Sequence, residues 1–193
     1  MASLESLQEN MRKIQIPEEI MAQLNFNILE GETYNSTVRN LLIKMEKLLT
    51  KEQQFSLMEQ EGCCKDGSKQ DSDCKNFAKE NADKPLTEKL ALLSSVENMM
   101  APCLNEDGTI TISWGGYQNG VHTGKTTCSC PHIMREVKNT ETVPVLYCGC
   151  CAGHFLYHLQ NAFNIKLRLK EINSSPLNTN GEKPCSMTFE IVG

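Results

Sequence analysis

The chain has 193 residues, a formal net charge of −5 and ten cysteines. This length can bury a core of its own, so the cysteines are not needed as staples for a mini-protein. The mildly acidic balance, with no basic stripe, argues against a nucleic-acid partner. No apolar run is long enough to predict a membrane span.

The first residues contain no apolar segment of the signal-peptide kind. We therefore expect a cytoplasmic protein, in which clustered thiols act as metal ligands or redox groups more often than as disulfides.

Residues 1–101 are predicted to form a helical N-terminal part. Pro17 suits the first turn of a helix. The strongest pattern places Val38, Leu41, Leu42 and Met45 on one helical face. The polar run 62–74 predicts a loop or a helix break. The expected helices are 4–14, 17–24, 36–49, 53–60, 76–82 and 85–100.

Residues 102–193 are predicted to form a mostly antiparallel sheet crossed by one late helix, 149–163. The apolar face of this helix holds Ala152, Phe155, Leu156, Leu159 and Phe163. Asn119-Gly120 is a strong turn signal. The expected strands are 109–114, 144–147, 165–172 and 187–192. The fold class is therefore α+β, with both parts in one compact domain.

All four histidines and five of the ten cysteines lie between His122 and His158. Clustered soft ligands of this kind bind a metal or exchange disulfides.

Strand parity suggests where a metal site would form. Leu167, Leu169 and Glu171 share a face of one strand, and Cys185 shares a face with Met187 on the last strand. If these strands form a hairpin, Glu171 and Cys185 lie close together on the inner side of the sheet. Cys148, just before the late helix, ends the chain path that leads to this pair. A carboxylate and thiolates at one sheet end suit zinc. The alternative is that Glu171 turns to solvent and Cys185 packs as a small core residue.

The stretch CGCCAGHFLYHLQNAFNIKLRLKE, from Cys148 to Glu171, and the later GEKPCSMTFEI resemble the C-terminal part of the 4-vinyl-reductase domain. The resemblance covers about residues 103–193 and implies a fold related to the transport-particle (TRAPP) subunits. In sensors of that family, three cysteines and a glutamate hold a structural zinc beside an effector pocket. Cys148, Glu171 and Cys185 match three of these positions, and Ser174 stands at the fourth.

The pattern CxCP, CxC and a late cysteine is most similar to a branch that includes proteins labelled L-2-amino-thiazoline-4-carboxylic acid hydrolases. The resemblance also implies a homodimer formed through helices.

Cys128 and Cys130 are the candidates for the missing ligand, because a CxC pair before a proline sits in a rigid turn. Together with Cys148 and Cys150 they form a rival site of four thiolates. The alternative is that these thiols pack or remain reduced at the surface.

His132 and Trp114 are expected to contact a ligand. His154 and His158 are four residues apart on the late helix, as a metal-binding pair would be, but they lie opposite its apolar face and are expected in solvent. Cys63, Cys64 and Cys74 are expected to be loop thiols.

Three functions fit this pattern. The first is a cytoplasmic zinc-bearing domain that binds a small, partly apolar molecule. The second is a zinc-dependent hydrolase of a small ring compound containing nitrogen or sulfur, with Glu171 or His132 moving protons. The third is a thiol redox protein that uses the run Cys148–Cys151.

Overall fold

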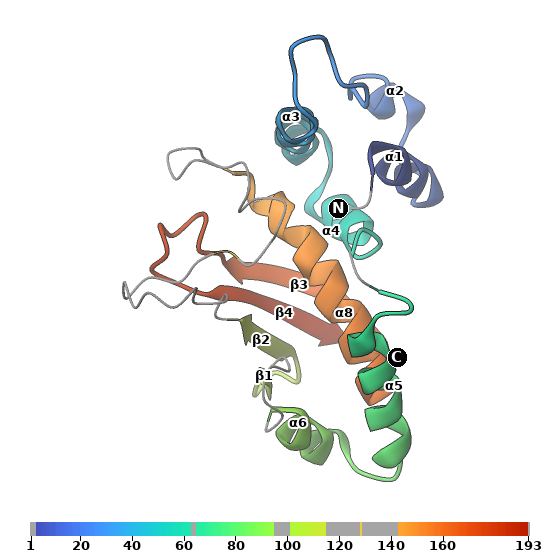
Figure 1. Cartoon of the computed structure of the whole chain (residues 1–193), viewed down its shortest axis with the longest axis vertical. Coiled ribbons are helices and arrows are strands. Elements are labelled where there is room, and N and C mark those ends of the chain that lie inside the picture. The colour runs from blue at the N-terminus through green and yellow to red at the C-terminus, as the bar shows by residue number, and fades with distance from the viewer. Residues whose placement is uncertain (1–2, 63–64, 95–100, 115–127, 129–142, 193) are drawn as a thin grey trace.

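The computed structural model describes residues 3–62, 65–94, 101–114, 128 and 143–192. Within these residues the chain forms seven α-helices and one four-stranded antiparallel sheet. The predicted α+β class is confirmed (Figure 1).

Four helices form the N-terminal part, and local capping explains where they begin. The Ser3 hydroxyl accepts a hydrogen bond from Ser6 N at the first helix. Thr33 and Thr50 begin the third and fourth helices through capping boxes. The helices are α1 (Leu4–Lys13), α2 (Glu18–Met21), α3 (Tyr34–Leu48) and α4 (Lys51–Met58).

Two more helices follow, α5 (Lys69–Glu80) and α6 (Leu86–Ser94). The predicted break over 62–74 is wrong in its second half. Ser68 caps α5 by accepting a hydrogen bond from Asp71 N at 3.0 Å, so the helix begins before the expected residue 76. Cys74 is consequently a buried helical residue and not a loop thiol.

The sheet has the strand order β1-β2-β4-β3, and all neighbouring strands are antiparallel. The last two strands form the hairpin that the parity argument assumed. The first strand was not predicted. It is joined to the next by a tight turn with Gly108 at φ +79°, a conformation that favours glycine. The strands are β1 (Ala101–Leu104), β2 (Ile110–Trp114), β3 (Leu167–Ser174) and β4 (Cys185–Ile191).

The strand predicted over residues 144–147 is wrong, because Val145–Cys148 forms a short 3-10 helix, η1. It leads directly into α8 (Gly149–Phe163). Pro144 precedes η1, and its fixed φ suits a helix start as well as a strand. A short apolar run such as residues 144–147 fits both a strand and a helical turn, so the sequence did not distinguish them.

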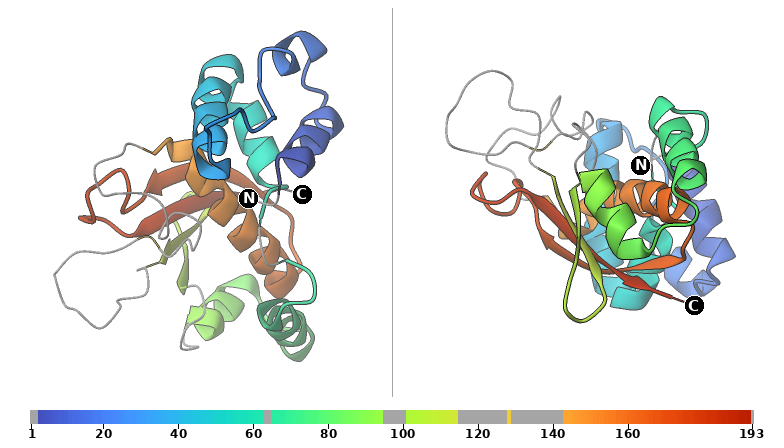
Figure 2. Two further views of the ribbon diagram at one scale, coloured as in Figure 1. Left: turned by 45° about the horizontal axis from the view of Figure 1, so that its top comes forward. Right: turned by 90° about the horizontal axis from the view of Figure 1, so that it is seen from below.

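Helix α8 lies between two buried cores (Figures 1 and 2). The first core joins α1–α4 with η1 and the start of α8. The second joins α5, α6, the sheet and the predicted apolar face of α8. That face is confirmed as buried: its members are Ala152, Phe155, Leu156, Leu159 and Phe163. Among the helices that the structure describes, none combines the length and apolar composition needed to cross a membrane.

Glycines allow α8 to approach the end of α4 closely. A Cβ atom at Gly153 would collide with the backbone of Met58 and would lie 3.0 Å from Gly62 N. A Cβ atom at Gly62 would lie 2.6 Å from the Gly153 carbonyl carbon and the His154 nitrogen. Real Cβ atoms do not make such contacts, so the two segments pack backbone against backbone.

Side chains satisfy backbone groups at both edges of the sheet. Leu169 N donates to Glu59 Oε1 at 2.6 Å, and Leu167 N donates to Gln160 Oε1 at 2.9 Å. At the other edge, the Ser94 hydroxyl donates to the Pro102 carbonyl oxygen at 2.9 Å. Satisfied edges discourage pairing with a second sheet.

We expect Gly153→Ala to lower the free energy of unfolding by about 2 kcal/mol, because overpacking against backbone outweighs the helix propensity gained by alanine. Gly149→Ala is a comparison on the same helix, because its nearest atoms belong to the Met58 side chain and not to backbone. Urea unfolding followed by circular dichroism measures both. Unchanged stability in Gly153→Ala would contradict the backbone contact.

Glu59 should make stability fall as pH rises. Burial raises the pKa of this carboxyl above its ordinary 4.5, against the opposing hydrogen bond from Leu169 N. Its stabilising contribution is therefore complete below pH 4.5 and is lost as pH rises through the raised folded pKa. Glu59→Gln keeps an acceptor for Leu169 N but does not titrate. Urea unfolding at several pH values should show a weaker pH dependence in this variant, and an unchanged one would contradict the role of Glu59.

Candidate functional site

Two of the predicted ligands come together at one end of the sheet. Cys185 begins β4 and pairs with Trp114 at the end of β2, while Ser174 ends β3 beside Ser186. Helix α8 precedes β3 and packs on it in the opposite direction, so its first residue lies at the same end (Figure 1). Cys148 is the N-cap residue of α8. We call the group Cys148, Ser174 and Cys185 the cysteine end of the sheet.

Both cysteines of this group are buried in the second core, each 5% exposed. Cys148 is also the last residue of η1, so it lies where the 3-10 helix passes into α8. Cys150 and Cys151 occupy the first turn of the same helix. Among the described residues, no disulfide joins two cysteines.

Glu171 does not join them, and the prediction that it turns to the inner face is wrong. A register shift between Leu169 and Glu171 inserts a bulge into β3. An extra residue reverses strand parity. Glu171 therefore pairs with Thr188 and is exposed, whereas Ser174 regains the inner side and is buried.

The hydroxyl of Ser174 is committed to the protein itself. It donates to the Pro184 carbonyl oxygen at 2.7 Å. This bond ties the end of β3 to the residue before Cys185 and closes the loop between the two strands. Ser174 is thus a structural residue at the cysteine end of the sheet.

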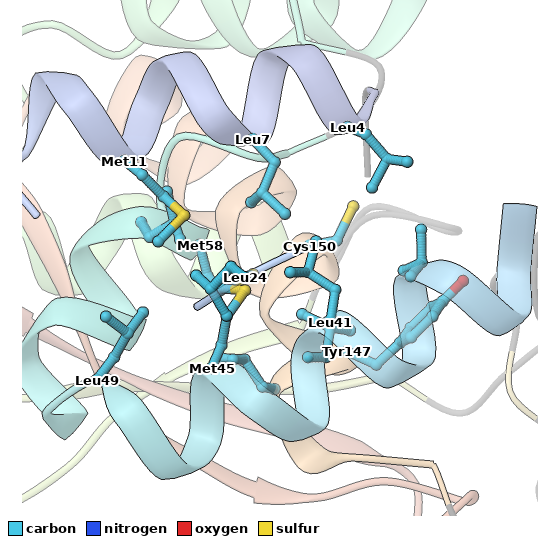
Figure 3. Close-up of a cluster of buried hydrophobic side chains, with 14 of the residues drawn as sticks. Leu4, Leu7, Met11, Leu24, Leu41, Met45, Leu49, Met58, Tyr147 and Cys150 are labelled. Carbon is cyan, nitrogen blue, oxygen red and sulfur yellow. The ribbon is translucent and has the colours of Figure 1, made fainter. Parts of the chain in front are cut away.

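Cys128 and Cys150 lie on the other side of α8, in the first core. The Cys150 thiol donates to the Glu61 carbonyl oxygen at 3.3 Å, and Figure 3 shows its side chain pointing toward α1. Three cysteines of the predicted four-thiolate site are described. Cys128 and Cys150 lie in the first core and Cys148 lies in the second, so the three are divided between two cores. Among the described residues, no group of three or more His, Cys, Asp and Glu side chains is arranged to hold a metal ion.

Three predicted residues cannot be placed in this geometry. Cys130 and His132 lie outside the described residues. Trp114 belongs to β2, but its side chain is also outside the described part.

His158 is fully buried, which corrects the expected solvent position, and His154 is half-buried. Their rings stack edge to face with centroids 4.4 Å apart, and the Tyr157 ring lies 5.3 Å from that of His158. The periodicity of α8 identified its most apolar face. It could not show that another segment also covers the opposite side.

The Asp71 carboxylate is a buried charge that sequence reasoning missed, and it is well satisfied. Lys75 Nζ donates to it at 2.8 Å, and Tyr157 and Asn161 of α8 donate to its other oxygen. The Lys75 hydrogen bond holds the pKa of Asp71 below its usual value, although burial opposes this. The network joins α5 to α8 and needs nothing further to complete it.

Glu61, directly after α4, is a second buried carboxylate that was missed. It is 1% exposed and accepts a hydrogen bond from Asn10 Nδ2 at 2.8 Å. The only signal in the sequence is a charged residue that follows the buried pair Leu57-Met58.

Comparisons of this chain with models of protein families, with curated proteins and with solved structures find no match.

Thiol mapping can test this arrangement of cysteines. Burial, followed by the charges of Asp71 and Asp73, raises the pKa of Cys74 to about 11. Cys103 is exposed on β1. With iodoacetamide at mildly alkaline pH, we expect Cys103 to be alkylated long before Cys74, Cys148 and Cys185, as read by peptide mass spectrometry. Faster labelling of Cys148 or Cys185 would contradict their burial.

Proposed function

We propose that this chain is a zinc-binding protein whose metal organises a domain that captures a small, partly apolar molecule. The observation that carries the proposal is the meeting of Cys148 and Cys185 in one buried core. These two cysteines come from different elements, and each matches a zinc ligand position in the resemblance to the 4-vinyl-reductase domain. Its further implications, a TRAPP-related fold, a homodimer and a cytoplasmic location, belong to the same proposal.

The donor set fits zinc in part. Thiolates are preferred zinc ligands. An exposed Glu171 fits poorly, as does a Ser174 hydroxyl that is bonded to Pro184. The remaining candidates among the predicted ligands include Cys130, which lies outside the described residues.

Cys128 and Cys150 are weaker candidates for the same ion. Both are buried in the core on the opposite side of α8, and Cys150 is hydrogen-bonded to Glu61.

A zinc-dependent hydrolase is the second candidate. The observation in its favour is that the described residues offer two thiols at the cysteine end and no complete ligand group. Zinc with an open coordination position supplies Lewis-acid chemistry, whereas four protein ligands make a structural site. The count of protein ligands therefore separates the two functions.

Elemental analysis of protein purified under reducing conditions tests the proposal. We expect about one zinc per chain in the wild type. Cys148→Ser and Cys185→Ser should each lose most of it, while the matched control Cys103→Ser, exposed on β1, should keep it. Glu171→Gln should also keep it.

A wild type without zinc would overturn the proposal, as would full zinc in both core variants. Loss of zinc in Glu171→Gln would restore the ligand set implied by the resemblance. X-ray absorption at the zinc edge counts the ligands and distinguishes the structural ion from the hydrolase.

A further inference from the structure

The Glu61 side chain is buried among apolar residues with half of its hydrogen-bonding capacity unused. Oε1 accepts from Asn10 Nδ2, whose amide oxygen in turn accepts from Lys13 Nζ at 3.3 Å. Oε2 is also buried, but it accepts no hydrogen bond. In the part of the chain that the structure describes, no cation forms an ion pair with Glu61.

Such an arrangement is costly for folding alone. Burying a polar atom without a partner costs about 1–3 kcal/mol, and burying a charge costs more. Asp71, the other buried carboxylate, has donors on both oxygens. The difference indicates that Glu61 receives a donor from outside the chain.

The surroundings of Glu61 favour a cation. Tyr34, the first residue of α3, is 36% exposed. Burial raises the pKa of its hydroxyl, and the negative charges of Glu61 and Glu5 raise it further. Two carboxylates, from α1 and from the segment after α4, therefore act on this hydroxyl.

The core beside Glu61 is apolar. Leu4, Leu7 and Leu41 belong to the same core as Cys150 (Figure 3), whose thiol is hydrogen-bonded to the Glu61 backbone. A protonated amine needs only one strong acceptor and an apolar surface for its carbon atoms.

We propose that Glu61 binds the protonated amine of a small, partly apolar ligand, with Oε2 accepting its N–H group. This inference rests on the proposed small-molecule function and names the chemical class of its ligand. The site adjoins the cysteine-bearing start of α8 through Cys150.

Benzylammonium and benzyl alcohol are a matched pair of probes, because they differ mainly in the charged group. Binding to the full chain is measured by NMR titration. We expect benzylammonium to saturate the wild type and to shift signals around Tyr34 and Cys150. Benzyl alcohol should bind at least about tenfold more weakly, as expected for loss of a charge-assisted hydrogen bond.

Glu61→Gln removes the charge at nearly constant shape and should weaken benzylammonium binding at least about tenfold. Glu59→Gln is the matched control, because it lies two positions earlier and its carboxylate serves the edge of β3. It should bind benzylammonium as the wild type does.

Equal binding of the two probes to the wild type would overturn the inference without any variant, so it stays testable even if Glu61→Gln fails to fold. So would unchanged benzylammonium binding in Glu61→Gln. Absence of saturation by benzylammonium would also overturn it, since Glu61 would then hold only water. Zinc is measured in the same samples. If the protein binds zinc but not the amine, this inference alone is overturned. If the wild type contains no zinc, the proposed function is overturned.

Discussion

The close approach of α8 to the end of α4 is the constraint on which the rest of the structure depends. Gly153 and Gly62 let the two backbones touch where any larger side chain would hold them apart. Because α8 is held there, it can cover the sheet with one side and close the helical core with the other. The cores share this helix, so a shift of α8 would disturb both of them and the residues at its first turn.

The same placement decides how the cysteines are used. Cys148 and Cys150 are two residues apart, and a helix start directs them to different sides. One joins Cys185 at the end of the sheet, and the other enters the helical core beside Glu61. In a loop, a CxC spacing suggests that both thiols bind one ion. At the beginning of a helix, the same spacing places the two thiols on different sides.

Periodicity predicted the features that depend on the local sequence. The apolar face of α8 and the face of α3 around Leu41 follow from helical spacing, and the last two strands follow from strand alternation. The failures depend on partners distant in the chain. The bulge before Glu171 reverses its direction, and the burial of His158 requires a second covering segment. The sequence of one strand does not show its register with the neighbouring strand. Strand parity alone therefore could not decide whether Glu171 points to the inner side of the sheet.

Buried carboxylates show how structural and functional roles can be separated on physical grounds. Asp71 accepts hydrogen bonds from α5 and α8, and this network stabilises the contact between the two helices. Glu61 has one donor, and its second oxygen accepts no hydrogen bond from the described residues. Folding alone would favour an apolar residue at this position. The presence of a carboxylate in such surroundings is best explained by a cation that binds after folding and offsets the free energy lost by burying it.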